Sequence, residues 1–146
     1  MKEYLYVVTP FLAWLVAGIL KFLINSLRTR RFAFDLIGYG GLPSNHSAIV
    51  SSMAALIALK EGVNTPAFGV AIALAFIVIL DAGSLRKQVG KHAAAINQLN
   101  SFVKSNQIVL RERIGHTRIE ILVGILTGTS VAYLIFIFAS IFIPSK

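Results

Sequence analysis

The chain has 146 residues, of which 56% are hydrophobic and only 14% are charged, and its mean hydropathy is +0.76. This composition excludes a water-soluble domain and predicts one small integral membrane domain over residues 1–146. The net charge of +8 is typical of loops that face anionic lipid or of a site for an anionic substrate. Nucleic acid is not an expected partner, because the basic residues interrupt membrane-length apolar segments. Without cysteine, the chain has neither disulfides nor thiolate metal ligands.

The first apolar segment covers residues 4–27 and is interrupted once, by Lys21. It is long for a secretory signal peptide and lacks a convincing cleavage site, so we predict a membrane helix. Arg28 lies seven residues after Lys21, so the two share one helix face, about 10 Å apart along the axis. Lys21 either extends to the membrane surface or faces a polar cavity, and the sequence leaves both alternatives open.

The second apolar segment, residues 47–59, follows the turn GLPSNHS at residues 41–47. The N–H groups at a helix start attract anions, and hydroxyls and an imidazole lie beside them here. The simpler alternative is a helix cap formed by Ser44 or Asn45, with His46 incidental. Residues 44–60 cover roughly 25 Å as a helix, less than the ~30 Å hydrocarbon layer. If this helix spans the membrane, we expect His46 to line a recessed cavity.

Three further segments complete the predicted fold. Pro66 is well placed for a first helical turn and opens an apolar segment over residues 66–80. Apolar positions then recur every three or four residues: Leu85, Val89, His92, Ile96, Leu99 and Val103. This pattern predicts an amphipathic helix that lies on a membrane or packs against the bundle. With a last apolar run over residues 121–143, the sequence predicts an all-α integral membrane bundle of about four transmembrane helices plus an amphipathic interfacial helix.

Lysine and arginine residues are concentrated in the loop after the first span and in the long segment between the third and fourth spans. The positive-inside rule therefore predicts that both basic segments are cytoplasmic and that both termini lie outside. If these cations bind a substrate, however, they are weaker indicators of topology.

The stretch GHTRIE at residues 115–120 precedes the last span. If the helix has begun by His116, this residue and Glu120 share a face, so the carboxylate can orient the imidazole. The alternative is a capping box made by Thr117 and Glu120. Arg111 lies just upstream, either as a ligand-binding cation or as a solvated loop charge.

The predicted topology brings polar side chains from several segments to one membrane face: Lys21, Arg28, His46, Arg86, Arg111, His116 and Glu120. Such a set suits phosphoryl transfer, because cations can hold the phosphoryl oxygens while one imidazole attacks and the other protonates the leaving oxygen. No segment pairs carboxylates at metal-binding spacing, so we expect neither a metal ion nor another cofactor.

Three ordered motifs resemble those of the type 2 phosphatidic acid phosphatase superfamily, which also contains the vanadium haloperoxidases. They are Lys21-x6-Arg28, PSNH at residues 43–46, and Arg111-x4-His116-x3-Glu120. GLPSNHS at 41–47, DAGSLRK at 81–87 and GHTRIE at 115–120 resemble its short divergent bacterial branch. The chain departs from the superfamily pattern at four places. Thr29 replaces a proline, Asn45 a glycine and Glu120 an aspartate, and Arg111 lies one residue nearer the histidine.

The resemblance implies roles for individual residues. His116 would be the nucleophile that forms a phospho-histidine, oriented by Glu120, and His46 the general acid. Phosphate would be bound by Lys21, Arg28, Arg111 and the turn of Ser44 and Asn45.

A second stretch, Arg86-x3-Gly90-x-His92, fits the spacing of the third motif better than Arg111 does. Ile96 occupies the place of its orienting acid, however. We therefore predict that His92 is a packed helix residue and that Arg86 is an additional phosphate ligand. We expect Asp81 to pair with Arg86 in a structural role.

Together these features predict a metal-independent membrane phosphatase that acts on a lipid phosphate or diphosphate. We place it in the bacterial inner (plasma) membrane with its site on the cytoplasmic side. The altered motifs motivate an alternative, a non-catalytic protein that binds or transports a phosphorylated lipid. Membrane lipids and a lipid phosphate are the expected partners, and the Gly124-x3-Gly128 pair offers a route to a homodimer.

Overall fold

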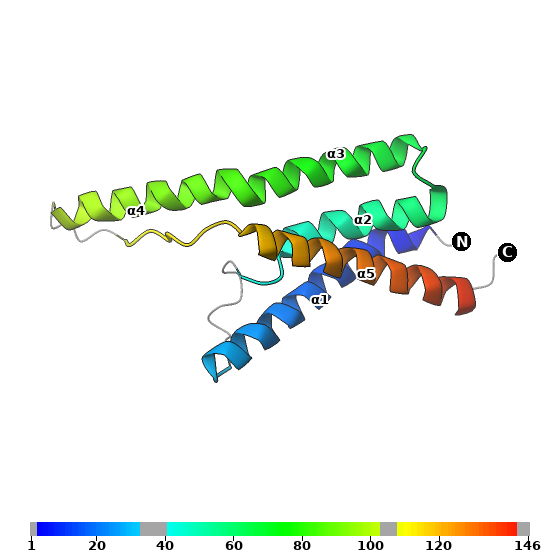
Figure 1. Cartoon of the computed structure of the whole chain (residues 1–146), viewed down its shortest axis with the longest axis horizontal. Coiled ribbons are helices and arrows are strands. Elements are labelled where there is room, and N and C mark those ends of the chain that lie inside the picture. The colour runs from blue at the N-terminus through cyan, green and yellow to red at the C-terminus, as the bar shows by residue number, and fades with distance from the viewer. Residues whose placement is uncertain (1–2, 33–40, 103–107, 143–146) are drawn as a thin grey trace.

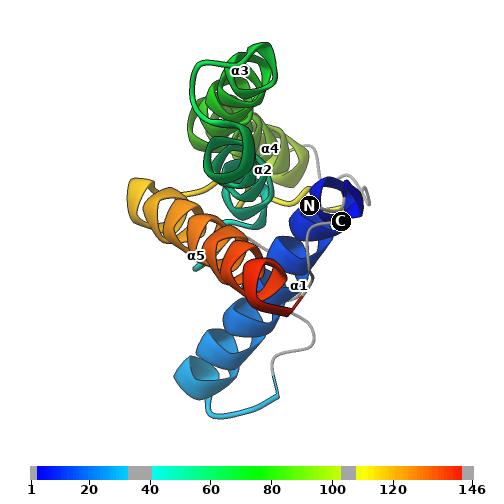
Figure 2. The same cartoon turned by 90° about the vertical axis from the view of Figure 1, so that its right-hand side faces the viewer.

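The computed structural model describes residues 3–32, 41–102 and 108–142. Within these ranges the chain forms five α-helices and one π-helical turn, and no strand. Helix α2 (Asn45–Glu61) lies at the centre, where it contacts α1 (Tyr4–Thr29), α3 (Pro66–Leu80) and α5 (Arg118–Phe142) (Figure 1, Figure 2). The predicted all-α membrane bundle is thereby confirmed.

Local sequence explains where these helices begin. Ser44 has extended backbone and its side chain accepts a hydrogen bond from the amide of Ser47, so α2 begins before the apolar run does. Thr65 caps α3 in the same way, accepting from the amide of Phe68 at 3.2 Å, and Pro66 follows in the first turn as predicted. Helix α1 ends two residues later than predicted, where Arg30 adopts left-handed backbone.

Helix α1 packs on the bundle through one position in every four: Leu5, Thr9, Ala13, Ala17 and Lys21. Three of these side chains are small, which lets the helix backbones approach closely. Lys21 continues the same stripe and is only 6% exposed. The alternative in which Lys21 extends to the membrane surface is therefore wrong, because this side chain points into the bundle.

Helices α2 and α5 cross closely at two glycines of α5. A Cβ atom at Gly124 would lie 2.5 Å from the carbonyl oxygen of Ser44, and one at Gly128 would lie 2.2 Å from that of Ala48. Neither position tolerates a side chain without moving the partner helix. The suggestion that these glycines join two copies of the chain is thus corrected, since they serve a contact within one chain.

The apolar segment 66–80 and the amphipathic segment after it, which the sequence predicts as separate elements, are continuous in the structure. Asp81–Leu85 forms a π-helical turn, η2, that connects α3 directly to α4 (Arg86–Phe102), so residues 66–102 form one continuous helix of 37 residues. Figure 1 shows α3 and α4 as a single rod. The amphipathic segment is therefore an extension of a membrane helix rather than a separate interfacial helix. Val103, the last residue of its predicted stripe, lies outside the described residues, as do residues 143–146.

In the part of the chain that the structure describes, three helices have the length and apolar composition to cross a membrane: α1, the α3–α4 rod and α5. Helix α2 has 17 residues, or about 25 Å, and is the short central segment that the sequence predicts. The first residues of α1 and the last of α5 lie at the same end of the bundle (Figure 1).

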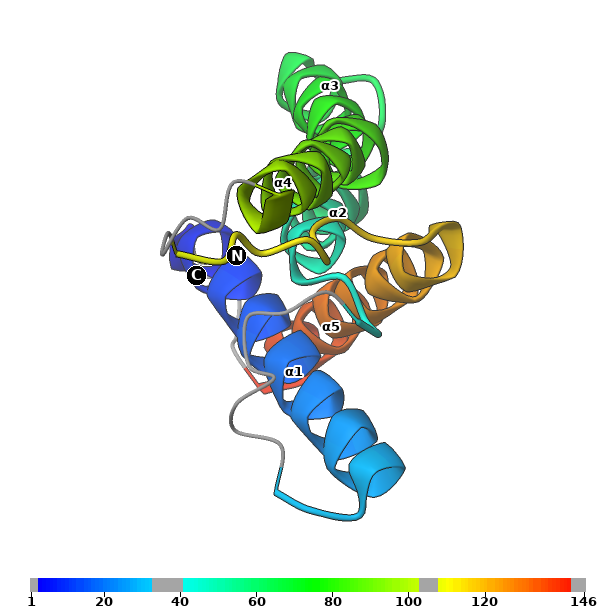
Figure 3. The same ribbon diagram turned by 90° about the vertical axis from the view of Figure 1, so that its left-hand side faces the viewer.

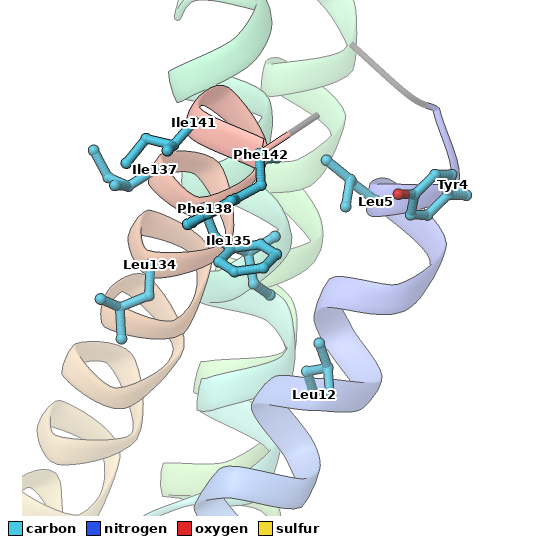
Figure 4. Close-up of a pocket in the computed structure, with 10 residues that line it drawn as sticks. Tyr4, Leu5, Leu12, Leu134, Ile135, Ile137, Phe138, Ile141 and Phe142 are labelled. Carbon is cyan, nitrogen blue, oxygen red and sulfur yellow. The ribbon is translucent and has the colours of Figure 1, made fainter. Parts of the chain in front are cut away.

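At that end, α1 and α5 enclose an apolar groove of about 620 Å³ (Figure 4). Its lining includes Leu5 and Leu12 from α1 and Leu134 and Phe138 from α5. The groove begins about 25 Å along α5 from its first residue, so it lies far from the end that carries the predicted motifs.

Candidate active site

The two histidines predicted to carry out the chemistry meet at one end of the bundle. His46 lies in the first turn of α2, and His116 lies two residues before α5. Their ring centroids are 6.4 Å apart, and the ring planes are tilted by 58°. The amide of Ser44 donates a 2.9 Å hydrogen bond to the carbonyl of Glu120, which fixes the two helix starts together. The rings are thus close enough to contact one small group at the same time.

Glu120 orients His116 and caps α5 at the same time. Its Oε2 atom lies 3.1 Å from Nδ1 of His116 and accepts a 3.0 Å hydrogen bond from the amide of Thr117. The Thr117 hydroxyl accepts from the amide of Glu120 at 3.2 Å, which completes a capping box. The two alternatives from the sequence, a carboxylate that orients His116 and a capping box with Thr117, are therefore both present. Nε2 is the ring nitrogen of His116 that does not face Glu120.

The backbone before His116 is fixed against the π-helical turn. Gly115 has a φ of 97°, and a Cβ atom there would lie 3.0 Å from the amide nitrogen of Lys87. The next amide, that of His116, donates to the carbonyl of Ala82 at 2.9 Å. π-Helical turns within α-helices, such as η2, frequently occur at functional sites. The turn η2 therefore sets the position of His116 through the hydrogen bond to Ala82. Figure 3 shows the yellow segment before α5 passing beside the α3–α4 rod.

The surroundings of His116 favour its neutral form. Burial lowers the pKa of His116 below its ordinary value of 6.5, and the positive charges of Lys21 and Arg86 lower it further. The hydrogen bond to Glu120 opposes this shift without reversing it. A neutral imidazole at pH 7 is the form that a nucleophile requires.

Two of the predicted phosphate-binding cations, Lys21 and Arg86, lie near the histidines, and a third, Arg111, lies near Lys21. The charges of Lys21 and Arg86 act on both imidazoles, and Lys21 in turn lies within electrostatic reach of Glu120 and Arg111. Nε of Arg86 lies 2.8 Å from Oδ2 of Asp81, across η2, which confirms the predicted pair. Segments far apart in the sequence therefore bring positive charge to one place.

Two polar atoms at the start of α2 are buried without a hydrogen-bond partner among the described residues. They are Oδ1 of Asn45 and Nδ1 of His46. Leaving such an atom unpaired costs about 1–3 kcal/mol, so native proteins rarely do so without a function. Both atoms belong to residues that the sequence predicts for the site.

Two predicted phosphate ligands are placed differently. The amide of Ser44 is engaged by Glu120, and its hydroxyl oxygen accepts hydrogen bonds from the amide and hydroxyl of Ser47. Ser44 therefore mainly joins α2 to α5, and only its hydroxyl proton remains for a phosphate. Arg28 is exposed two turns beyond Lys21, and no contact in the described ranges joins it to either histidine.

The structure also changes the interpretation of His92 and draws attention to Asn25. His92 is not packed as predicted but lies exposed on α4, away from the site, so its motif-like spacing has no counterpart in space. Asn25, which sequence reasoning missed, lies one turn beyond Lys21, and a Cβ atom at Gly41 would be 3.8 Å from its Oδ1 atom. Its position four residues after Lys21, on the same helix face, was the available signal.

Across residues 3–32, 41–102 and 108–142, no group of three or more His, Asp or Glu side chains is arranged to hold a metal ion. The polar groups that converge here are instead imidazoles and cations, with carboxylates that already have partners.

The fold and this site define an integral membrane helix bundle with two imidazoles and several cations gathered at one end. The chain belongs to the divergent PAP2 family, whose model matches residues 3–131. It is also similar to the uncharacterized membrane protein YuiD of Bacillus subtilis (strain 168). The two are 33% identical over 132 residues, covering 80% of this chain and 84% of that protein. No solved structure matches the chain. The resemblance drawn from the motifs is thereby confirmed at the level of the family.

Proposed function

We propose that this protein is a membrane phosphatase that hydrolyses the phosphate monoester or diphosphate of a lipid through a phospho-histidine intermediate. The observation that carries the proposal is the pair of imidazoles 6.4 Å apart, one of them held by Glu120 and surrounded by cations. Family membership supports the same class of reaction.

In the first step, Nε2 of His116 attacks phosphorus while the bond from phosphorus to the lipid oxygen breaks. Glu120 stabilises the positive charge that develops on the attacking ring, because its carboxylate faces Nδ1. Lys21, Arg86 and Arg111 stabilise the charge on the phosphoryl oxygens. His46 donates a proton to the leaving lipid oxygen, and the lipid alcohol or lipid monophosphate departs.

In the second step, His46 is the base that accepts a proton from water. The resulting hydroxide attacks phosphorus, the bond from phosphorus to Nε2 breaks, and inorganic phosphate leaves with His116 neutral again. The proton balance closes, because His46 gives one proton in the first step and recovers one in the second.

A lipid is the proposed substrate because the site is part of a membrane bundle. The histidines lie at the starts of α2 and α5, next to helices whose outer faces are apolar and exposed. A lipid phosphate can reach such a site with its chains in the bilayer and its headgroup among the cations.

The test is phosphate release from a panel of lipid phosphates and diphosphates by the purified protein, with a chelator present. We expect turnover by the wild type, none by His116→Gln and little by His46→Gln. His92→Gln is the matched control, because it removes an exposed imidazole outside the site and leaves turnover unchanged. Turnover by His116→Gln would refute the phospho-histidine route.

The departures from the motifs favour one competing function, binding of a phosphorylated lipid without hydrolysis. Asn45 replaces the usual glycine beside His46, and its Oδ1 atom is buried without a partner among the described residues. That function predicts saturable binding of vanadate or a lipid phosphate by wild-type protein with no phosphate released from any member of the panel.

A further inference from the structure

One face of α4 is apolar and uncovered. Leu85, Val89, Ile96 and Leu99 are 61%, 45%, 43% and 63% exposed, and His92 lies exposed among them. The opposite side of the helix is covered by the returning chain. A Cβ atom at Gly90 would lie 2.3 Å from the carbonyl oxygen of Glu112, and Asn97 exchanges two 2.8 Å hydrogen bonds with the backbone of Leu110.

The exposed stripe has the spacing and the residue types of a heptad repeat. Val89 and Ile96 are seven residues apart and occupy the a positions, while Leu85, His92 and Leu99 occupy the d positions. β-Branched residues at a combined with leucine at d favour parallel two-stranded coiled coils. Over these two heptads the pattern suits a second copy of the same helix running in the same direction.

The fold explains why this stripe is not placed flat on the membrane surface. Helix α4 continues α3 through η2 as one 37-residue rod, about 55 Å long, whereas the hydrocarbon layer is only ~30 Å thick. When α3 spans the membrane, α4 therefore extends beyond the hydrocarbon layer. Figure 1 shows α4 extending past the starts of α2 and α5. Copies of one protein in one membrane have the same orientation, so their projecting helices run parallel, as the repeat requires.

Charge does not oppose this pairing, although the chain carries a net charge of +8. The positions that flank the seam along α4 after its first residue are uncharged: Gln88, Ala93, Ala95, Asn100 and Phe102. Lys87 and Lys91 are exposed on other faces, at f and c positions that point away from a partner. Two identical helices therefore meet here without like charges along their seam.

We infer that the α4 helices of two copies form a parallel coiled coil outside the membrane and make the protein a homodimer. The stripe covers roughly 20 Å of helix, which buries less than the roughly 800 Å² per partner of a standard interface. The pairing is therefore weak between free molecules and depends on anchoring of both copies in one bilayer, which raises their effective concentration. His92, a polar residue at a d position, fixes the register at a cost in affinity.

The absence of cysteine in the chain allows a direct test by single-cysteine cross-linking of the full-length protein in native membranes. Two variants place a thiol on the seam, Ile96→Cys and Leu99→Cys. Two matched controls place it at exposed positions on other faces of the same helix, Lys91→Cys and Gln98→Cys. Under mild oxidation, we expect several-fold more covalent dimer from the seam variants than from the controls.

Equal yields at the four positions, or no dimer from any of them, would overturn the inference. So would seam thiols that resist a water-soluble maleimide without cross-linking, because the stripe would then lie in lipid. Two substitutions check the result without cysteine, by the mass of the protein in nanodiscs large enough to hold two copies. His92→Leu increases the dimer fraction, and Ile96→Asp abolishes the dimer while circular dichroism shows unchanged helix content.

Discussion

Replacing Gly124 by alanine is expected to push α2 and α5 apart at the point that holds the two histidines together. A Cβ atom at this position would lie 2.5 Å from the carbonyl oxygen of Ser44, whereas ordinary contacts begin near 3.4 Å. The helices must therefore separate by about 1 Å, and overpacking of this kind costs about 1–3 kcal/mol. Alanine regains about 1 kcal/mol through its helix propensity, so the net loss of stability is about 0–2 kcal/mol.

The same displacement affects the site. Ser44 lies two residues before His46, and its amide donates a hydrogen bond to the carbonyl of Glu120, so separation of the helices moves one imidazole relative to the other. A shift of about 1 Å in a catalytic arrangement can cost on the order of 10²-fold in rate. Gly124→Ala is therefore expected to lose phosphatase activity more severely than it loses stability.

Gly18→Ala is the matched control, because Gly18 also lies within a helix but a Cβ atom there meets nothing within 4 Å. We expect this variant to be more stable than the wild type by about 0.5–1 kcal/mol and fully active. Thermal unfolding in detergent, followed by circular dichroism, gives the stability comparison. If Gly124→Ala unfolds at the same temperature as Gly18→Ala, the close crossing of α2 and α5 is wrong.

Three further outcomes follow from the site. Glu120→Gln is expected to lower kcat by roughly 10²-fold or more with little change in KM, because an amide does not stabilise a positively charged His116 ring; steady-state phosphate release measures both constants. Because burial lowers the pKa of His116, the neutral ring persists to a pH below 6.5, so the acid limb of kcat/KM against pH should have its midpoint below that value; a midpoint above it would contradict the assignment. Lys21→Met is expected to weaken vanadate binding by roughly tenfold in titration calorimetry, since a charged hydrogen-bond donor is lost, whereas Arg28→Met should change it little because Arg28 is exposed and distant.

The sequence predicted the helices well where capping residues set their limits. Thr65 and Pro66 determine the start of α3, and its predicted range matches the structure. The prediction from the sequence was wrong where one local pattern is compatible with either a loop or a helical turn. The sequence predicts two elements on either side of Asp81 and Gly83, yet the chain accommodates both residues in a π-helical turn. In that turn Asp81 pairs with Arg86, and the Ala82 carbonyl accepts a hydrogen bond from the amide of His116.

The candidate site was likewise predicted only in part from the sequence. His46, His116 and Glu120 were identified because their spacing matches a family, and the family is confirmed. Which cations join them depends on how the helices cross, and one-dimensional spacing does not contain that information. Lys21 and Arg28 share a face of α1, but only Lys21 lies where that helix still contacts the bundle. The Gly124 and Gly128 pair fits a contact between copies or within one chain equally well, because both require the same close approach.

The balance of charge at the site links its stability to its ligand. The carboxylate of Asp81 is already paired with Arg86. The buried Lys21 is attracted by the carboxylate of Glu120 and repelled by the positive charge of Arg111. Bringing these cations together costs free energy that the described carboxylates offset only in part. An anion with several oxygens, such as a phosphoryl group, removes this excess positive charge. Binding of phosphate or vanadate should therefore raise the unfolding temperature, and the rise should be lost in Lys21→Met.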